Sequence, residues 1–200
     1  MKKEISLDYN HKRRVIWFFS IFLVLMLYFF QNSSFLLRAV TSLEFLILFY
    51  LIDHFFNVRF LPRHYVYIFV IAIVSILLSP LYFVYPSYDK VQHFVQPMLI
   101  CSIIFFIVSK LKLELKWKLI FAFLITFSIL GLFEIGEYVA DNLFNLKLQG
   151  VYLRDLSGFK KFNLVTEPLD DTMQDLILGF LGSGLYTLAN GFYLKRIKKR

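Results

Sequence analysis

Long apolar stretches alternate with short polar segments along the whole chain of 200 residues. There are six such stretches, at approximately 15–30, 35–56, 65–84, 88–108, 119–142 and 169–194. A helix needs about 20 mostly apolar residues to cross the hydrocarbon core of a bilayer, and all but the first stretch reach that length. The pattern predicts an all-α membrane protein. We expect a polytopic bundle of about six transmembrane helices, forming one membrane domain over residues 1–200.

Proline, serine and polar clusters indicate where these helices end. Pro80 is expected to kink the last turn of the third helix, and Ser87 to act as the N-cap of the fourth. The segment 144–168 is the longest polar connection, with 25 residues. Loops longer than about 15 residues are usually functional or disordered. We therefore expect this loop to lie over the end of the bundle as a lid.

Basic residues are concentrated in four places that an even number of spans brings to one side of the membrane. The tails 1–14 and 195–200 carry five Lys or Arg each, the turn 57–64 carries two and the turn 110–118 carries four, together 16 of the 22. Cytoplasmic loops are rich in Lys and Arg. This predicts a multi-pass protein of the plasma membrane with both termini in the cytoplasm and the loop 144–168 outside.

Composition supports a membrane protein and removes several other classes. The chain is 58% hydrophobic and has 25 Phe, whereas soluble domains have about 45–50% apolar residues. The net charge of +8 does not indicate nucleic-acid binding, because the charges flank the apolar stretches. The single Cys101 lies in an apolar run, which excludes a disulfide framework and a cysteine-based metal site. No cleavable signal peptide is expected at the first apolar run.

Eight ionisable residues fall in apolar stretches at the end that faces outward in this topology. Carboxylates within a membrane span are costly and are functional-site hypotheses by default. Glu134 is expected about 10 Å deeper than Asp141, at 1.5 Å per helical residue. The eight residues are Asp89 and His93 of the fourth stretch, Glu134, Glu137 and Asp141 of the fifth, and Asp170, Asp171 and Asp175 of the sixth.

So many carboxylates in a poor dielectric need compensation. A divalent cation, protonation, and pairing with Lys90, Arg154 or a cationic ligand are the three possibilities. Oxygen ligands with one imidazole suit Mg²⁺, Mn²⁺, Fe²⁺ or Zn²⁺. The predicted metal ligands are His93, Glu134, Glu137, Asp171 and Asp175, with Glu137 and Asp171 as the candidate catalytic residues. The predicted surrounding residues are Asp89, Lys90, Asp141 and Asp170.

Some of these residues also have structural interpretations. Asp170, Asp171 and Asp89 stand where helix N-caps are expected. His93 could hydrogen-bond a neighbouring helix, and the spacing of Gly179 and Gly182 is typical of close helix packing. Asp175 and Glu134 lie too deep in their stretches for capping, which favours a specific role for them.

Three motifs in order carry a family resemblance. They are Tyr88-Asp89-Lys90-x-x-His93-Phe94, Glu134-x-x-Glu137-Tyr138, and Asp171-Thr172-x-x-Asp175-Leu176 followed by Gly182. The chain resembles the YjdF-type bacterial and archaeal membrane proteins over about 86–190, and more distantly the VanZ-like proteins. Where YjdF-type members have Gly-Thr-Gln-Gly-Asp before the last helix, this chain has Thr166-Glu167-Pro168-Leu169-Asp170. The resemblance implies a compact multi-span fold without an assigned activity, and VanZ-like members point to the cell envelope.

Three functions remain open from the sequence. The first is metal-dependent hydrolysis or transfer on a lipid-linked or envelope substrate, in which the metal activates water. The second is a cation or proton-coupled transporter that uses the same carboxylates. The third is a non-catalytic structural membrane protein. Membrane lipids are the expected partners and nucleic acid is not; the sequence sets neither enzymatic activity nor oligomeric state.

Overall fold

A computed structural model of the protein describes residues 10–11, 13–18, 21–22, 25, 36–144, 147–154 and 162–198. The chain forms two compact units, Met1–Ser79 and Pro80–Arg200, called here the first and second unit. Most of the predicted first span, 15–30, most of the basic tail 1–14, and the last two residues of the tail 195–200 lie outside the described residues.

The first unit is built around α2 (Leu36–Phe55) and α3 (Pro62–Ile71), with a buried carboxylate at their junction. Asp53 accepts hydrogen bonds from the Phe60 amide at 3.1 Å, from the Tyr65 hydroxyl and from Arg13 Nη1 at 3.2 Å. These donors compensate a carboxylate that is only 1% exposed. Asp53 therefore fixes the turn between the two helices.

The predicted third span is less regular than a single helix. After α3 the chain continues as a π-helix, Ala72–Leu77, and then as a 3₁₀ segment, Ser79–Phe83. Leu78 donates its amide to Ile73 O at 2.9 Å, a bond across five residues. Pro80 has no amide hydrogen and cannot continue an α-helix. The regular geometry does change around Pro80, as predicted, but the change begins at Ala72.

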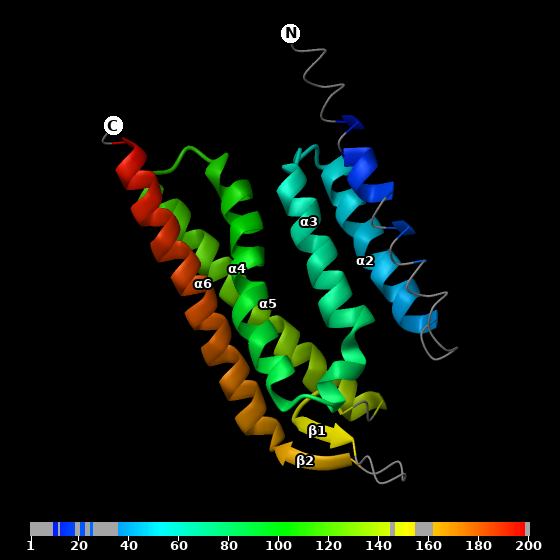
Figure 1. The fold of residues 1–200 in the computed structure, drawn as a ribbon. Helices are drawn as coiled ribbons and strands as arrows, with labels where there is room; N and C mark the ends of the chain where they lie inside the picture. The colour runs from blue at the N-terminus through cyan, green and yellow to red at the C-terminus, as the bar shows by residue number, and fades with distance from the viewer. Residues whose placement is uncertain are drawn as a thin grey trace. The chain divides into compact units, whose positions relative to one another are not determined.

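Three long helices form the second unit: α4 (Pro86–Ser109), α5 (Leu115–Phe144) and α6 (Pro168–Lys198). Each packs against the other two (Figure 1). Among the described residues, these three are long and apolar enough to cross a membrane, and Phe45–Phe55 and Pro62–Leu77 are shorter apolar helices. The predicted N-cap at Ser87 is wrong: Tyr85 is the N-cap of α4, because Pro86 takes the first helical position.

Two glycines allow α6 to approach its neighbours closely. A Cβ atom added at Gly182 would overlap the carbonyl of Phe94 in α4, and one at Gly179 would overlap the side chain of Leu130 in α5. Small residues at helix contacts have this role in membrane bundles. The packing interpretation of the two glycines is confirmed.

The middle of the second unit contains small polar side chains that are satisfied by their own helices. Thr126 donates its hydroxyl to Ala122 O at 2.7 Å, and Ser183 donates to Gly179 O at 2.7 Å. Thr187 donates to Ser183 O at 2.8 Å. These hydroxyls are therefore engaged within their helices, which lets them be buried at low cost.

A β-hairpin joins α5 to α6. Strands β1 (Val151–Arg154) and β2 (Phe162–Thr166) pair in antiparallel register. The chain is mostly helical, as predicted, but the sequence analysis did not anticipate this sheet, because strands of four and five residues leave little periodicity. The tip of the predicted loop, 155–161, lies outside the described residues.

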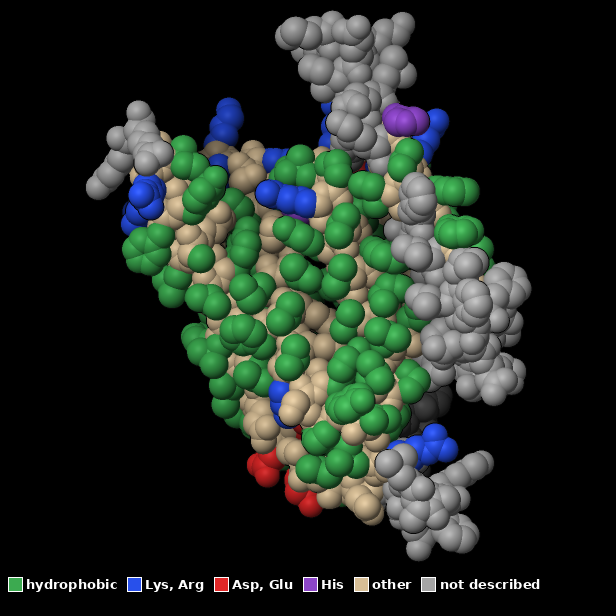
Figure 2. Space-filling model, viewed as in Figure 1, with side chains coloured by type: hydrophobic (Ala, Val, Ile, Leu, Met, Phe, Trp, Pro, Cys, Tyr) green, Lys and Arg blue, Asp and Glu red, His purple; other side chains and the backbone are tan. Residues whose placement is uncertain are grey.

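Charge is distributed unevenly along the second unit. Figure 2 shows hydrophobic side chains over the flank of the long helices and Asp or Glu at the end where α6 begins. We call this the acidic end: α4 and α6 begin there, α5 ends there, and the hairpin lies there (Figure 1). The opposite end carries Lys110, Lys112, Lys116, Lys118 and Lys195.

Candidate functional site

The acidic end brings together the ionisable residues of three helices. Asp89, Lys90 and His93 come from the first two turns of α4, and Glu134 and Glu137 from the last turns of α5. Asp171 and Asp175 come from the start of α6. Because α4 and α6 run in the same direction and pack against each other as well as against α5, residues up to 86 positions apart in the sequence become neighbours.

Lys90 is the cation at the centre of this group. Its ammonium contacts Oδ1 of Asp171, lies 3.1 Å from Oδ1 of Asp175 and lies 3.5 Å from Oδ2 of Asp89. Asp171 is 5% exposed and Asp175 is 3% exposed. Buried charges persist only when they are paired, so Lys90 compensates part of the buried negative charge. Pairing with Lys90 was one of the three compensations considered from the sequence.

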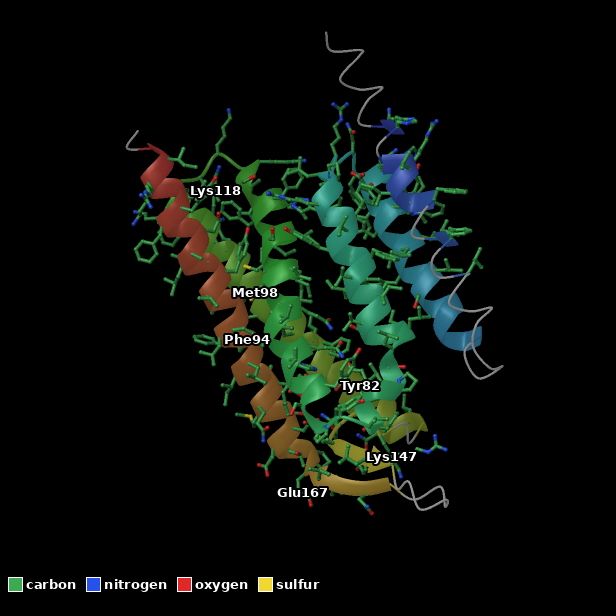
Figure 3. The ribbon with its side chains drawn as sticks, viewed as in Figure 1. Tyr82, Phe94, Met98, Lys118, Lys147 and Glu167 are labelled. Carbon is green, nitrogen blue, oxygen red and sulfur yellow. The ribbon has the colours of Figure 1, made fainter. Side chains whose placement is uncertain are left out.

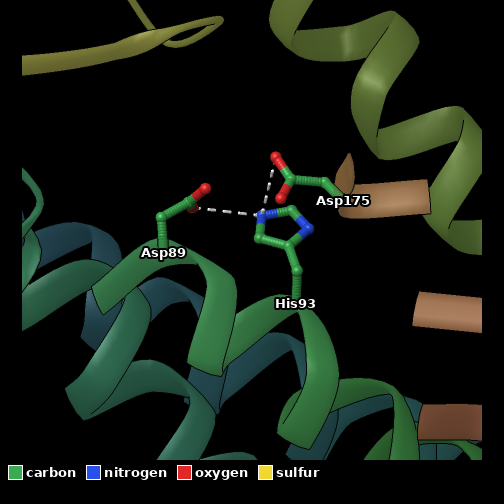
Figure 4. Close-up of side chains that lie close together, drawn as sticks. All are labelled: Asp89, His93 and Asp175. Carbon is green, nitrogen blue, oxygen red and sulfur yellow. Dashed lines mark ion pairs between the residues drawn. The ribbon is translucent and has the colours of Figure 1, made fainter. Parts of the chain in front are cut away.

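His93 uses its two ring nitrogens in different directions. Nε2 lies 3.3 Å from Oδ1 of Asp89 and 3.9 Å from Oδ2 of Asp175, and Figure 4 shows both carboxylates facing this nitrogen. Nδ1 lies 3.8 Å from Oε1 of Glu134. Asp89 and His93 are one helical turn apart on α4, which confirms that they share a face.

Asp89 and Asp175 each divide their two oxygens between Lys90 and His93. Oδ2 of Asp89 and Oδ1 of Asp175 face the ammonium, whereas Oδ1 of Asp89 and Oδ2 of Asp175 face the imidazole. As a result, one ligand atom each of Asp89, His93 and Asp175 lie within 4.8 Å of one another. We call these three residues the Asp–His–Asp cluster.

This cluster differs from the set predicted as ligands. His93 and Asp175 belong to both sets. Asp89, predicted as a surrounding residue, is a member of the cluster, whereas Glu134, Glu137 and Asp171 lie outside it. Glu134 is 6% exposed, lies on the Nδ1 side of His93 and is hydrogen-bonded to the Thr172 hydroxyl.

Glu137 is half-buried and near the cluster. Its carboxylate lies within electrostatic range of Glu134, His93 and Asp89. Tyr82 precedes α4 (Figure 3) and lies within electrostatic range of Asp89 and Glu137. Glu137 and Tyr82 therefore face the site without belonging to the three-residue cluster.

Two aspartates of the predicted set hold the chain between α5 and the hairpin. Asp141 accepts the amide of Leu148 at 2.7 Å and that of Gln149 at 2.8 Å. Oδ2 of Asp171 accepts the amide of Gly150 at 2.9 Å. Asp141, near the C-terminus of α5, thus has backbone amides as its partners.

Asp170 is exposed, and it is not among the described residues that contact Lys90 or His93. Its predicted role as N-cap, and that of Asp171, are wrong because α6 begins earlier, at Pro168. Both aspartates instead occupy the first turn of α6, where the helix dipole favours negative charge.

Sequence reasoning missed three residues that connect the site to the hairpin. Gln149 donates Nε2 to the Thr172 hydroxyl at 3.0 Å, and Gly150 donates its amide to Asp171. Thr172 lies inside the motif Asp171-Thr172-x-x-Asp175, which was an available signal. Gln149 and Gly150 stand in a polar connection where the sequence alone does not indicate which amides contact a helix.

Aromatic residues surround the acidic end. Tyr82 and Tyr88 make an edge-on contact with ring centroids 5.1 Å apart, and Tyr85 and Tyr138 are exposed. Tyrosine is enriched at membrane–water boundaries. Figure 3 shows Glu167 and Lys147 near this end and Lys118 near the opposite end.

Three packed apolar helices of membrane-spanning length, with a buried ionic site at one end, define an integral membrane protein. The chain belongs to the family described as "Predicted membrane protein (DUF2238)", whose model matches residues 13–196. This confirms the resemblance to the YjdF-type membrane proteins. No curated protein and no solved structure matches the chain.

Proposed function

We propose that this protein binds a divalent metal ion at Asp89, His93 and Asp175. The observation that supports the proposal is the approach of their three ligand atoms to within 4.8 Å. Ligand atoms around an ion with bonds of about 2.0–2.2 Å lie about 3–3.5 Å apart. The His93 nitrogen lies 3.3 and 3.9 Å from the two carboxylate oxygens, so small side-chain rotations suffice. One imidazole with two carboxylates suits Mn²⁺, Fe²⁺ or Zn²⁺, and Mg²⁺ less well.

Glu134 acts on this ion through His93. A histidine that ligates a metal usually donates its other ring N–H to a carboxylate, which fixes the tautomer and the ring orientation. Glu134 lies on the Nδ1 side of His93, opposite the Asp–His–Asp cluster. In the proposal Glu134 therefore positions His93 with Nε2 available to the metal, in place of its predicted role as a ligand.

The reaction class that fits such a site is metal-assisted hydrolysis or transfer. Three protein ligands leave positions on the ion open for water and substrate. Glu137 is the nearby carboxylate that remains to act as general base, and Asp171 with Lys90 would orient the substrate. The interfacial tyrosines are consistent with a lipid-linked or envelope substrate.

A proton- or cation-coupled transporter is the second candidate. Lys90, Asp175, His93 and Glu134 form consecutive ion-pair contacts, as a relay would. However, α4, α5 and α6 contain no Asp, Glu or His between this group and the basic end. The described Thr126, Ser183 and Thr187 donate their hydroxyls within their own helices. This arrangement favours a site at one end over a path through the unit.

The proposal also includes the orientation of the protein in the membrane. Six spans would place both termini in the cytoplasm and the acidic end on the outer face of the plasma membrane, within one membrane domain. The lysines at the opposite end of the second unit support this orientation. Accessibility of single cysteines at Lys112 and Lys147, introduced into a Cys101→Ser chain in cells, tests it. Labelling of the Lys147 position from outside is expected, and labelling of the Lys112 position from outside would contradict the orientation.

Elemental analysis of the purified chain tests the metal. After repletion with Mn²⁺ and removal of excess ion, we expect about one equivalent in the wild type, as for a single three-ligand site. Asp175→Asn should lose the ion, whereas Glu167→Gln should keep it, because Glu167 is an exposed carboxylate one turn before Asp171. Equal metal content in all three proteins would contradict the site.

A further inference from the structure

We infer that residues 147–154, called here the strap, close over the proposed metal site, and that the ion and the closed strap stabilise each other. The inference rests on the proposed function for the identity of the ion, but the contacts that tie the strap to the site do not depend on it. Two separate links connect the strap to residues of the site, and a third contact holds it from outside.

The first link runs through Asp171. Its Oδ1 contacts the Lys90 ammonium and its Oδ2 accepts the Gly150 amide at 2.9 Å. Asp171 is buried, as is Gly150. A carboxylate held by an ammonium on one oxygen keeps the other oxygen fixed for the backbone amide. The position of Gly150 therefore depends on the ion pair inside the site.

The second link runs through Thr172. Gln149 Nε2 donates to the Thr172 hydroxyl at 3.0 Å, and that hydroxyl is hydrogen-bonded to Glu134. Glu134 in turn lies 3.8 Å from Nδ1 of His93. Because Thr172 both accepts and donates, it connects the strap to the carboxylate that positions His93. Thr172 and Gln149 are thus positioning residues that act through Glu134.

The third contact lies outside the site. Asp141 at the end of α5 accepts the Leu148 and Gln149 amides. Gly150 follows with φ of 89°, a conformation that glycine adopts without strain. The strap thus has an outer anchor, a glycine at which the chain turns, and two inner links to the site. Asp141 can be removed without touching the cluster, which separates the strap from the site experimentally.

The proposed ion strengthens the first link by charge. Without an ion, the Lys90 ammonium is shared among Asp89, Asp171 and Asp175. An ion bound by Asp89 and Asp175 would compete for their charge and repel the ammonium toward Asp171. The Lys90–Asp171 pair, and with it the Gly150 amide, would then be held more tightly. Coupling of this kind is reciprocal: the factor by which the ion favours the closed strap is also the factor by which the open strap binds the ion more weakly.

Hydrogen exchange of the strap amides without metal tests the links. In the purified chain in lipid nanodiscs, Lys90→Gln removes the ammonium and Thr172→Val removes the hydroxyl. We expect either change to speed exchange at Gly150 at least about fivefold, the effect of losing one ordinary hydrogen bond. Glu167→Gln is the control and should leave exchange unchanged. Unchanged exchange at Gly150 in the folded Thr172→Val protein, or in Lys90→Gln, would overturn the inference.

Addition of Mn²⁺ then tests the coupling. Saturating Mn²⁺ should slow exchange at Gly150 in the wild type. Asp141→Asn, which loosens only the outer anchor, should weaken Mn²⁺ binding by no more than that factor. If Mn²⁺ binds but does not slow hydrogen exchange at the Gly150 amide, the coupling is refuted and the proposed metal site is not. If Mn²⁺ does not bind at all, the proposed function and the coupling fail together, and the metal-free exchange still decides whether the links hold the strap.

Discussion

The ammonium of Lys90 lies 3.1 Å from Oδ1 of Asp175, although 85 residues separate the two in the chain. This contact joins α4 to α6 inside an apolar bundle. It also leaves the second oxygen of Asp175 facing His93. The same pair therefore holds two helices together and orients a candidate metal ligand.

Removing this ammonium should destabilise the protein. Lys90→Met leaves Asp171 and Asp175 buried without their cation, and breaking a buried pair in this way costs about 3–5 kcal/mol. Lys116→Met is the matched control, because Lys116 pairs with Glu114 on the surface and both side chains are exposed. Thermal unfolding in detergent measures both. A Lys90→Met protein that unfolds at the same temperature as the wild type would show that the ammonium contributes no net stability.

Alanine should affect the stability of the protein differently at Gly182 and at Gly184, because α4 approaches α6 closely only at the first of these positions. Gly182→Ala places a methyl group on the Phe94 carbonyl, which is backbone and cannot move aside. Overpacking of this kind costs about 1–3 kcal/mol. Gly184→Ala meets only Phe123 at 3.8 Å, an ordinary contact, so it should not lower stability. Equal unfolding temperatures for the two variants would contradict the packing described for α6.

Gly150 should be intolerant of a side chain. At φ of 89° an alanine is strained, and its Cβ would lie 3.0 Å from Thr166 O. Strain of this kind costs about 1–3 kcal/mol. Gly136→Ala serves as the control, since no atom of the described part of the chain lies within 4 Å of its Cβ position in α5. Limited proteolysis should cut Gly150→Ala faster near the hairpin and leave Gly136→Ala at the wild-type rate; equal rates for both would count against the strained turn.

The two glutamates of α5 should differ in their effect on metal binding. Glu134→Gln removes the charge behind His93, and loss of such an orienting carboxylate weakens metal affinity about 10- to 100-fold. Glu137 lies outside the Asp–His–Asp cluster, so Glu137→Gln should change the affinity little and lower any hydrolytic rate instead. Titration with Mn²⁺ measures the affinities. A larger loss in Glu137→Gln than in Glu134→Gln would reverse the assigned roles.

The hydropathy pattern predicted the positions of α4, α5 and α6 along the chain and the end of these helices at which the acidic residues lie. The i, i+4 spacing put Asp89 and His93 on one face of α4, which the structure confirms. Spacing within one helix cannot set the rotation of that helix against its neighbours, however. That rotation decides that Asp89 meets His93 Nε2 while Glu134 meets Nδ1. The sequence alone therefore could not indicate that Asp89 lies on the Nε2 side of His93 and Glu134 on its Nδ1 side.

Other features depend on contacts that leave no local pattern. The hairpin has short strands, and its ties to Asp141 and Asp171 are made by backbone amides, which every residue but proline possesses. The π-helix at Ala72–Leu77 likewise lies in a uniformly apolar run. Pro168 at the first position of α6 was a signal for an earlier helix start, because proline favours that position.

Electron paramagnetic resonance of Mn²⁺ bound to the purified chain tests the central claim most directly. Pulsed measurements detect a histidine nitrogen coordinated to the ion. The wild type is expected to show coupling to one imidazole nitrogen, and His93→Gln, if it still binds Mn²⁺ through Asp89 and Asp175, should lose it. Glu167→Gln should keep the coupling. Mn²⁺ bound without nitrogen coupling in the wild type, or with coupling that survives in His93→Gln, would contradict a metal site at Asp89, His93 and Asp175.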